Sequence, residues 1–116
     1  MKSNIKISDK VTGLLQKGTS FEGKLSFEGA VRIGGQFKGE IFSRDILIID
    51  ETADVEANIE ASEVIVAGQV RGNIYASKKI SMKAPANFKG TVTTSTLSID
   101  DGVVFEGASY MPKNDN

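Results

Sequence analysis

Phe37-Lys38-Gly39-Glu40-Ile41 is one of six five-residue segments that share one pattern and together decide the fold. Each segment begins with an apolar residue, continues with a charged residue and a small one, and reaches an apolar or small residue two positions later. The six segments are Phe21–Leu25, Phe37–Ile41, Val55–Ile59, Val70–Ile74, Phe88–Val92 and Phe105–Ser109. Their central small residues are 16, 18, 15, 18 and 17 residues apart. A unit this short cannot bury a core alone, so the units must stack on one another.

A second apolar segment follows each of the first five units and alternates with period two, which is typical of a strand. These segments are Val31–Ile33, Ile46–Ile48, Val64–Val66, Ile80–Met82 and Leu97–Ile99. Short polar corners such as Ser43–Asp45 and Ser77–Lys79 separate the two strands of a unit. Two or three short strands in each repeat describe one turn of a solenoid. The predicted fold is therefore an all-β parallel β-helix of about six coils.

The residue before each central small residue is charged, and stacking would place these side chains in one column. In chain order they are Glu22, Lys38, Glu56, Arg71, Lys89 and Glu106. Four of the five neighbouring steps pair opposite signs, which would penalise a slip of register. A solvated strand face that simply carries mixed charge is the alternative interpretation.

The central small residue is glycine in five units and Ala57 in the third. Glycine here indicates either a backbone that needs positive φ or close packing beside the core. Because alanine avoids positive φ, Ala57 favours close packing.

Composition limits the classes of protein to which the chain can belong. The 116 residues suit one domain, with an expected flexible tail at 1–18, a β-helix at 19–110 and a short disordered tail at 111–116. The 14 basic and 15 acidic residues are intermixed, so nucleic acid is not an expected partner. The chain has no cysteine, no signal-peptide pattern and no apolar run long enough for a membrane helix, so a cytoplasmic location is predicted.

The residues most used in catalysis are missing. The chain has no histidine and no cysteine, which removes the usual general base and the usual soft metal ligands. Hexapeptide-repeat acyltransferases share the short-repeat architecture, but their catalysis uses a histidine. The acidic pairs Asp50-Glu51 and Asp100-Asp101 fall at corners and are interpreted as solvated turns. The sequence therefore predicts no enzyme, no cofactor and no metal.

With these repeats in place, the chain resembles the bactofilin family. Lys17–Gly23, followed by Phe27-Glu28-Gly29 and Val31-Arg32-Ile33, resembles the family's opening coil, and Phe37–Ile41 resembles its second coil. The resemblance extends from about residue 14 to residue 110.

The resemblance implies a right-handed parallel β-helix of triangular cross-section that polymerises end to end without nucleotide. It also implies a bacterial cytoskeletal scaffold that organises cell shape or cell-wall-modifying enzymes, together with other scaffold proteins. Several members of the family reach the inner face of the cytoplasmic membrane through a short apolar N-terminal tail. The residues that could make such a contact here are Met1, Ile5 and Ile7, which charged residues such as Lys2 and Lys6 interrupt.

The two ends of the solenoid are the predicted polymer contacts. An open coil exposes unpaired backbone groups and a slice of apolar core, and no capping helix is visible after Tyr110. The predicted C-terminal contact comprises Leu97, Ile99, Val103, Phe105 and Tyr110. The predicted N-terminal contact comprises Phe21, Leu25, Phe27, Val31 and Ile33. In the alternative interpretation these are ordinary core residues of a monomer.

The competing function is a non-polymerising module that binds a carbohydrate or a protein along one face of the solenoid. Such a module needs a stripe of aromatic or polar side chains. Phe42 and Tyr75 are the only candidates, and two residues do not make a stripe.

Overall fold

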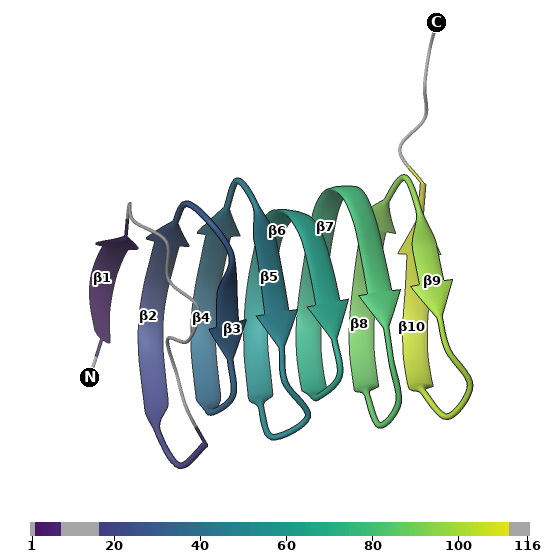
Figure 1. Cartoon of the computed structure of the whole chain (residues 1–116), viewed down its shortest axis with the longest axis horizontal. Helices are drawn as coiled ribbons and strands as arrows, with labels where there is room; N and C mark the ends of the chain where they lie inside the picture. The colour runs from purple at the N-terminus through teal and green to yellow at the C-terminus, as the bar shows by residue number, and fades with distance from the viewer. Residues whose placement is uncertain (1, 8–16, 112–116) are drawn as a thin grey trace, which may run out of the picture.

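The computed structural model describes residues 2–7, as backbone, and residues 17–111. These ranges contain strands and turns but no helix. The strands are β1 (Lys2–Ile7), β2 (Ser20–Phe27), β3 (Val31–Ile33), β4 (Gln36–Ser43), β5 (Ile46–Ile49), β6 (Asp54–Val66), β7 (Gln69–Met82), β8 (Asn87–Thr94), β9 (Leu97–Ile99) and β10 (Val104–Tyr110). All pair in parallel and wind into a solenoid with β1 at one end and β10 at the other (Figure 1). The predicted all-β parallel solenoid is confirmed.

The first stack of strands follows the six repeated segments. Its order is β1-β2-β4-β6-β7-β8-β10, and it aligns each unit with the next without a slip at the central small residue. Thus Gly23 lies opposite Gly39, and Gly72 lies opposite Gly90. The six repeats contribute one strand each to this stack, namely β2, β4, β6, β7, β8 and β10. From the first of these strands to the last, the chain completes five turns of the solenoid.

The second stack consists of the five segments that alternate with period two. Here β3 pairs with β5, β5 with the last part of β6, the last part of β6 with that of β7, and β7 with β9. The turns that close each coil continue the stacking, since Ala67 donates its amide hydrogen to Ile49 and Lys83 donates to Val66.

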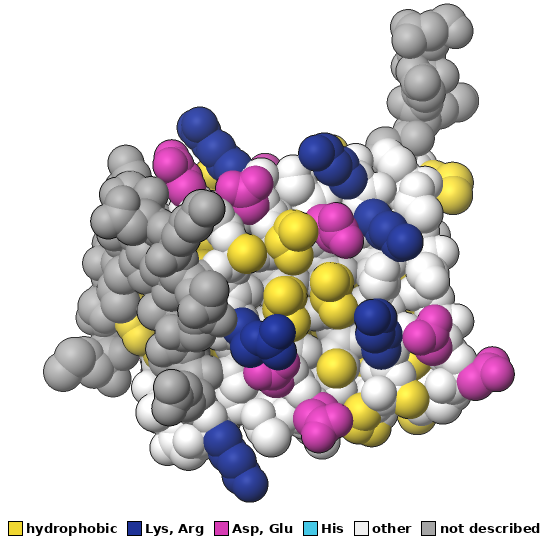
Figure 2. All heavy atoms as spheres, viewed as in Figure 1, with side chains coloured by type: hydrophobic (Ala, Val, Ile, Leu, Met, Phe, Trp, Pro, Cys, Tyr) yellow, Lys and Arg dark blue, Asp and Glu magenta, His cyan; other side chains and the backbone are white. Residues whose placement is uncertain are grey.

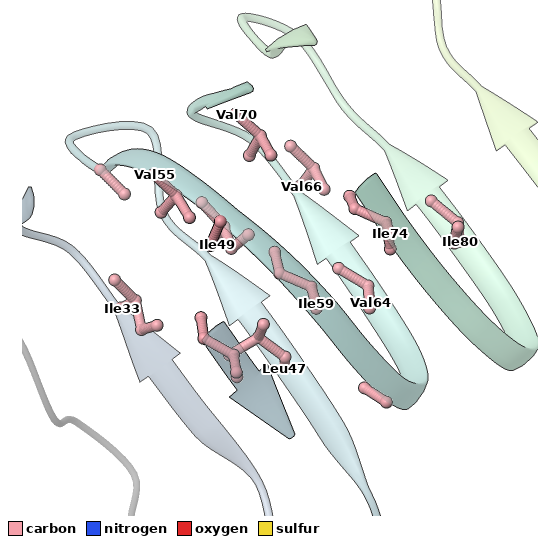
Figure 3. Close-up of a cluster of buried hydrophobic side chains, with 14 of the residues drawn as sticks. Ile33, Leu47, Ile49, Val55, Ile59, Val64, Val66, Val70, Ile74 and Ile80 are labelled. Carbon is pink, nitrogen blue, oxygen red and sulfur yellow. The ribbon is translucent and has the colours of Figure 1, made fainter. Parts of the chain in front are cut away.

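The core lies between the two stacks, where side chains of the same position in successive coils form columns (Figure 3). One column runs through Leu25, Ile41, Ile59, Ile74 and Val92, and another through Ile33, Ile49, Val66 and Met82. All of these residues are buried. Strand alternation sends every second side chain inward, so one coil adds a layer of apolar side chains to the layer before it.

The central glycines of the repeats are needed for two reasons, their backbone conformation and the close approach of the neighbouring coil. Gly39 and Gly90 both have a φ of 140°, which side chains of L-residues rarely adopt. A Cβ on Gly39 would lie 1.8 Å from the carbonyl oxygen of Gly23, and a Cβ on Gly90 would lie 1.8 Å from that of Gly72. The expected close packing is therefore confirmed. The inference from Ala57 that positive φ is not needed was wrong for the glycine-bearing coils, because the third coil alone takes a different backbone there.

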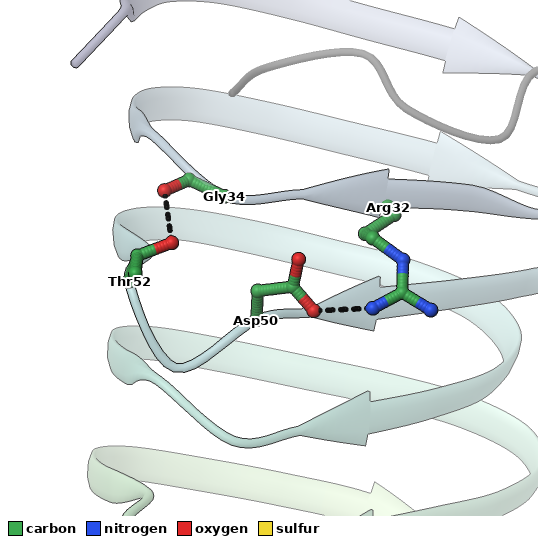
Figure 4. A network of polar contacts seen from close by, with 4 residues as sticks. All are labelled: Arg32, Gly34, Asp50 and Thr52. Carbon is green, nitrogen blue, oxygen red and sulfur yellow. Dashed lines mark hydrogen bonds and ion pairs between the residues drawn. The ribbon is translucent and has the colours of Figure 1, made fainter. Parts of the chain in front are cut away.

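Two polar contacts join neighbouring coils near the corner that follows β3 (Figure 4). Arg32 Nη1 is 2.6 Å from Asp50 Oδ1, and the hydroxyl group of Thr52 donates to the carbonyl oxygen of Gly34 at 2.7 Å. Each contact joins β3 and the turn after it to the corresponding part of the next coil. The acidic pair at this corner therefore contributes one carboxylate to an ion pair between coils.

The face formed by the second stack carries a small apolar area. Figure 2 shows apolar side chains at the centre of this face, with charged side chains around them. The outward positions of β5 and β6 contribute Ile46, Ile48 and Ile65, which are all partly buried.

Candidate polymerisation interface

The C-terminal coil leaves part of the apolar core open to solvent. Ile99 continues the column of Met82, yet Ile99 is 43% exposed while Met82 is 0% exposed. Leu97, Val103 and Phe105 also pack against the core and are only partly buried. Each occupies a core position over which no further coil lies among the described residues.

Both strands of this coil also present a free edge. Among the described strands, β10 pairs only with β8, and β9 pairs only with β7. The outer backbone N–H and C=O groups of β9 and β10 can therefore pair with another chain. The partly exposed core residues of this coil therefore form an apolar end surface with two unpaired strand edges beside it. The end of a second solenoid can cover this surface.

Two residues of this coil point away from the apolar end surface. Val104 aligns with Asn87 on the outer side of the first stack, and it is exposed. Tyr110 aligns with Thr93 and is 59% exposed. Of the five residues predicted for the C-terminal contact, Tyr110 is therefore placed on the side of the solenoid, and the other four are placed at its end.

The N-terminal end differs from the C-terminal end. Phe21 stacks on Phe37 with ring centroids 5.4 Å apart and is partly buried. The other four residues of the predicted N-terminal contact are all buried, namely Leu25, Phe27, Val31 and Ile33. A contact through these four side chains requires them to be uncovered first.

Strand β1 accounts for part of this difference. It pairs in register with β2, from Lys2 opposite Glu22 to Ile7 opposite Phe27. The first stack therefore has a rung before the first repeat, inside the segment that we expected to be a tail. The register places Lys2 at the charged position of the repeat and Ser3 at its central small position, so Lys2–Ile7 follows the repeat pattern with serine in place of glycine. The two-residue spacing of Ile5 and Ile7 also matches that of Leu25 and Phe27.

The predicted membrane contact is not tested by these observations. The backbones of Ile5 and Ile7 belong to β1, and Met1 lies outside the described residues. Over the described ranges, the protein has no helix that is long and apolar enough to cross a membrane. The contact stays a prediction.

The column of charged residues has the predicted order. Each of these residues lies opposite the next one along the stack, from Glu22 opposite Lys38 to Lys89 opposite Glu106. Two of the steps are ion pairs, Glu56 with Arg71 at 3.5 Å and Lys89 with Glu106 at 3.9 Å. All four side chains are more than half exposed, so these pairs contribute mainly to register.

Within residues 17–111, no cluster of acidic side chains is arranged to hold a metal ion. Among the described residues, other surface features include the open end, two grooves along the first stack and the apolar area on the second stack.

Comparison with known proteins agrees with this architecture. The model of the bactofilin family, described as polymer-forming cytoskeletal, matches residues 13–110. This chain belongs to the bactofilin family. The family match begins shortly before β2 and ends at the last residue of β10, so it covers all six repeats.

Two bactofilins of Myxococcus xanthus strain DK1622 are similar in sequence. BacO is 35% identical over 86 residues, which are 74% of this chain and 68% of BacO. BacP is 28% identical over 85 residues, which are 73% of this chain and 35% of BacP. The matched region therefore spans about a third of the length of BacP.

A solved structure shares the fold. The solid-state NMR structure of the cytoskeletal bactofilin BacA matches with a TM-score of 0.80 and 27% sequence identity. The match covers 91% of this chain and 100% of the BacA chain. The solenoid described above is therefore the bactofilin fold.

Proposed function

We propose that this bactofilin is a cytoskeletal scaffold whose solenoids join end to end, and that its C-terminal coil is the first contact. The observation that carries the proposal is the exposed apolar end surface of this coil. Ile99 and Phe105 occupy core columns that no following coil covers within the described residues, whereas the corresponding Met82 and Phe88 are fully buried.

The free energy of this contact comes from burial. Covering a large apolar side chain contributes about 1.5–3 kcal/mol, and the apolar end surface holds Leu97, Ile99, Val103 and Phe105. The free edges of β9 and β10 add backbone hydrogen bonds. Nucleotide hydrolysis is not needed for such a reaction, because association itself removes apolar surface from water.

We further propose that C-terminal ends join to each other. At the opposite end, Leu25, Phe27, Val31 and Ile33 are already buried, so that end offers little apolar surface. Among the described residues, the end surface that is as apolar as the C-terminal coil of one copy is the C-terminal coil of a second copy. Joining these two ends therefore buries the most apolar surface. Among the described strands β1 pairs only with β2, so the outer edge of β1 would supply the second contact that a filament requires.

A non-polymerising binding module is the weaker alternative for the protein as a whole. Natural solenoids that stay monomeric cover their terminal coils. The C-terminal coil here carries no cap within the described residues. The role in cell shape or in positioning cell-wall enzymes is proposed from membership of the family alone.

Electron microscopy of the purified chain, freed of nucleotide and divalent metal, tests the assembly. We expect filaments about as thin as one solenoid from the unmodified protein and folded particles of one or two subunits from Phe105→Arg. The matched control is Val104→Arg, which adds the same charge to the neighbouring, outward-facing residue and should leave filaments intact. Filaments that survive Phe105→Arg would contradict the proposal.

Cross-linking tests which ends meet. The chain has no cysteine, so Val104→Cys places a single thiol at an exposed, outward-facing position of the C-terminal coil. If C-terminal ends join each other, a short bis-maleimide will link subunits in pairs and produce no larger species. If each C-terminal end meets an N-terminal end, the thiols lie one subunit apart and linked pairs will not form.

A further inference from the structure

Three exposed aromatic side chains form a row on the outer face of the first stack. Phe42, Tyr75 and Tyr110 are 43%, 45% and 59% exposed. Strand register places them in one column at every second coil, with Glu60 and Thr93 at the coils between them. The sequence suggested only two candidates for such a stripe, because Tyr110 was assigned to the end of the solenoid. Its place in the register makes it the third.

A groove of about 640 Å³ lies along the part of this row that holds Phe42 and Tyr75, and Tyr110 lies in line with it beyond Thr93. Its other side is the neighbouring outward column, in which Asn58, Asn73 and Thr91 form a ladder. The amide group of Asn73 donates to Asn58 Oδ1 at 3.1 Å, and the hydroxyl group of Thr91 donates to Asn73 Oδ1. A side-chain amide has two N–H donors, so the ladder retains donors for the carbonyl groups of a bound chain.

The spacing of the aromatic row matches one kind of peptide. Coils of a parallel stack are about 4.8 Å apart, so aromatic side chains at every second coil are about 9.6 Å apart. A polyproline II helix has three residues per turn and a rise of about 3.1 Å per residue, so it repeats every ~9.3 Å. A proline-rich chain laid along the solenoid axis would therefore present the same face to each ring. Its backbone makes no internal hydrogen bonds and needs external donors.

The charges that line the groove define the peptide further. Glu40 and Glu60 flank Phe42, one on the same strand and one on the next coil, while Lys24 is the only basic residue of the lining. The carboxylates complement a cationic side chain on the bound segment. An oligosaccharide would also suit the rings and amides, and its hydroxyl groups could donate to the two carboxylates. A cationic side chain in addition gains the charge attraction of both carboxylates.

We propose that this face, defined by Phe42, Tyr75 and Tyr110 together with Glu40 and Glu60, docks a basic proline-rich segment of another protein. Aromatic-lined grooves bind such segments because the polyproline II conformation is already formed and loses little entropy on binding. The proposal does not depend on end-to-end assembly, since the row is complete within one subunit. In a filament each subunit would offer one such site.

The probe is a fluorescent synthetic peptide of Ala-Pro-Pro repeats that ends in arginine, titrated with the full chain and followed by anisotropy. Tyr75→Ala should weaken binding about tenfold, as truncation of a central aromatic anchor does. Tyr75→Phe keeps the ring and is the matched control, with an expected loss of less than about threefold. Because Tyr75 is exposed, neither change should alter the melting temperature appreciably.

The acidic residues have their own test. Glu60→Lys should weaken binding of the arginine peptide and leave binding of an Ala-Pro-Pro peptide without arginine unchanged. Glu63→Lys, which makes the same charge change on the second stack, should affect neither peptide. The proposal is overturned if the unmodified protein does not bind the arginine peptide at millimolar concentration, or if Tyr75→Ala binds it normally. Binding of a chitin oligosaccharide in its place would make the groove a glycan site.

Discussion

Phe88 and Phe105 stack with ring centroids 5.4 Å apart and planes inclined by 24°, yet Phe88 is fully buried and Phe105 is only partly buried. The two rings occupy the same column in successive coils. The residue type is the same, so the difference in exposure comes from position: β10 covers Phe88, and no further coil among the described residues covers Phe105. A second copy of the C-terminal end could cover Phe105 as Phe105 covers Phe88.

Ile99→Glu should prevent assembly without unfolding the subunit. The side chain is already 43% exposed, so the new carboxylate stays hydrated in the monomer but would be buried in the contact. Ile49→Glu, in the same column but fully buried, should instead lower the free energy of unfolding by more than about 3 kcal/mol. Sedimentation velocity and urea denaturation separate the two effects. A polymerising Ile99→Glu variant would argue against burial of this side chain in the contact.

Gly90→Ala should destabilise the solenoid strongly. The added Cβ would meet the carbonyl oxygen of Gly72 at 1.8 Å, and the φ of 140° is unfavourable for alanine. We expect a loss of about 2–4 kcal/mol in the free energy of unfolding. Ala57→Gly is the matched control at the equivalent position of the third coil, where a loss of about 1 kcal/mol is expected. Equal losses in urea denaturation would show that the third coil has no distinct backbone requirement.

Asp50→Asn should cost less than about 1 kcal/mol, although the ion pair with Arg32 is short. The Arg32 side chain is 53% exposed and that of Asp50 is 31% exposed, so water screens their attraction. A double-mutant cycle with Arg32→Gln measures the coupling energy, which should fall between 0.1 and 1 M salt because the Debye length shortens from ~10 to ~3 Å. A coupling energy that does not depend on salt would indicate that the pair is better shielded than its exposure implies.

Deletion of residues 2–7 should promote association at the N-terminal end. Loss of β1 leaves the outer edge of β2 unpaired beside Leu25 and Phe27, which are buried in the intact chain. We expect assembly to begin at a lower protein concentration, as measured by light scattering. Combined with Phe105→Arg, the deletion should produce dimers, because only the N-terminal ends remain competent. An unchanged concentration threshold would show that β1 does not limit association at this end.

Much of the fold could be predicted because the repeat appears directly in the residue types. The spacing of the six glycine or alanine positions predicted the first stack, and the period-two segments from Val31–Ile33 to Leu97–Ile99 predicted the second. Strand β1 was not predicted, because Ser3 takes the place of the central glycine and precedes Gly23 by 20 residues, a longer step than any between the six repeats. Its pairing depends on the free edge of β2, which is a property of the folded solenoid.

The candidate polymerisation interface could also be predicted only in part from the sequence. Sequence alone indicated that the last coil carries Leu97, Ile99, Val103 and Phe105 at core positions. It could not show that the equivalent residues of the first coil are buried, because burial depends on what the folded chain places over them. It also assigned Tyr110 to the end contact, whereas strand register places Tyr110 on the side of the solenoid in line with Tyr75.

The amino-acid sequence by itself determined the solenoid, its parallel register and the order of charges along it. These follow from local alternation and from the fact that one short unit cannot bury a core without its neighbours. Only the tertiary structure decided which end is open and which residues of distant coils share a surface. Exposure at an end depends on whether another strand pairs there, and alignment along the axis depends on the summed lengths of all intervening corners.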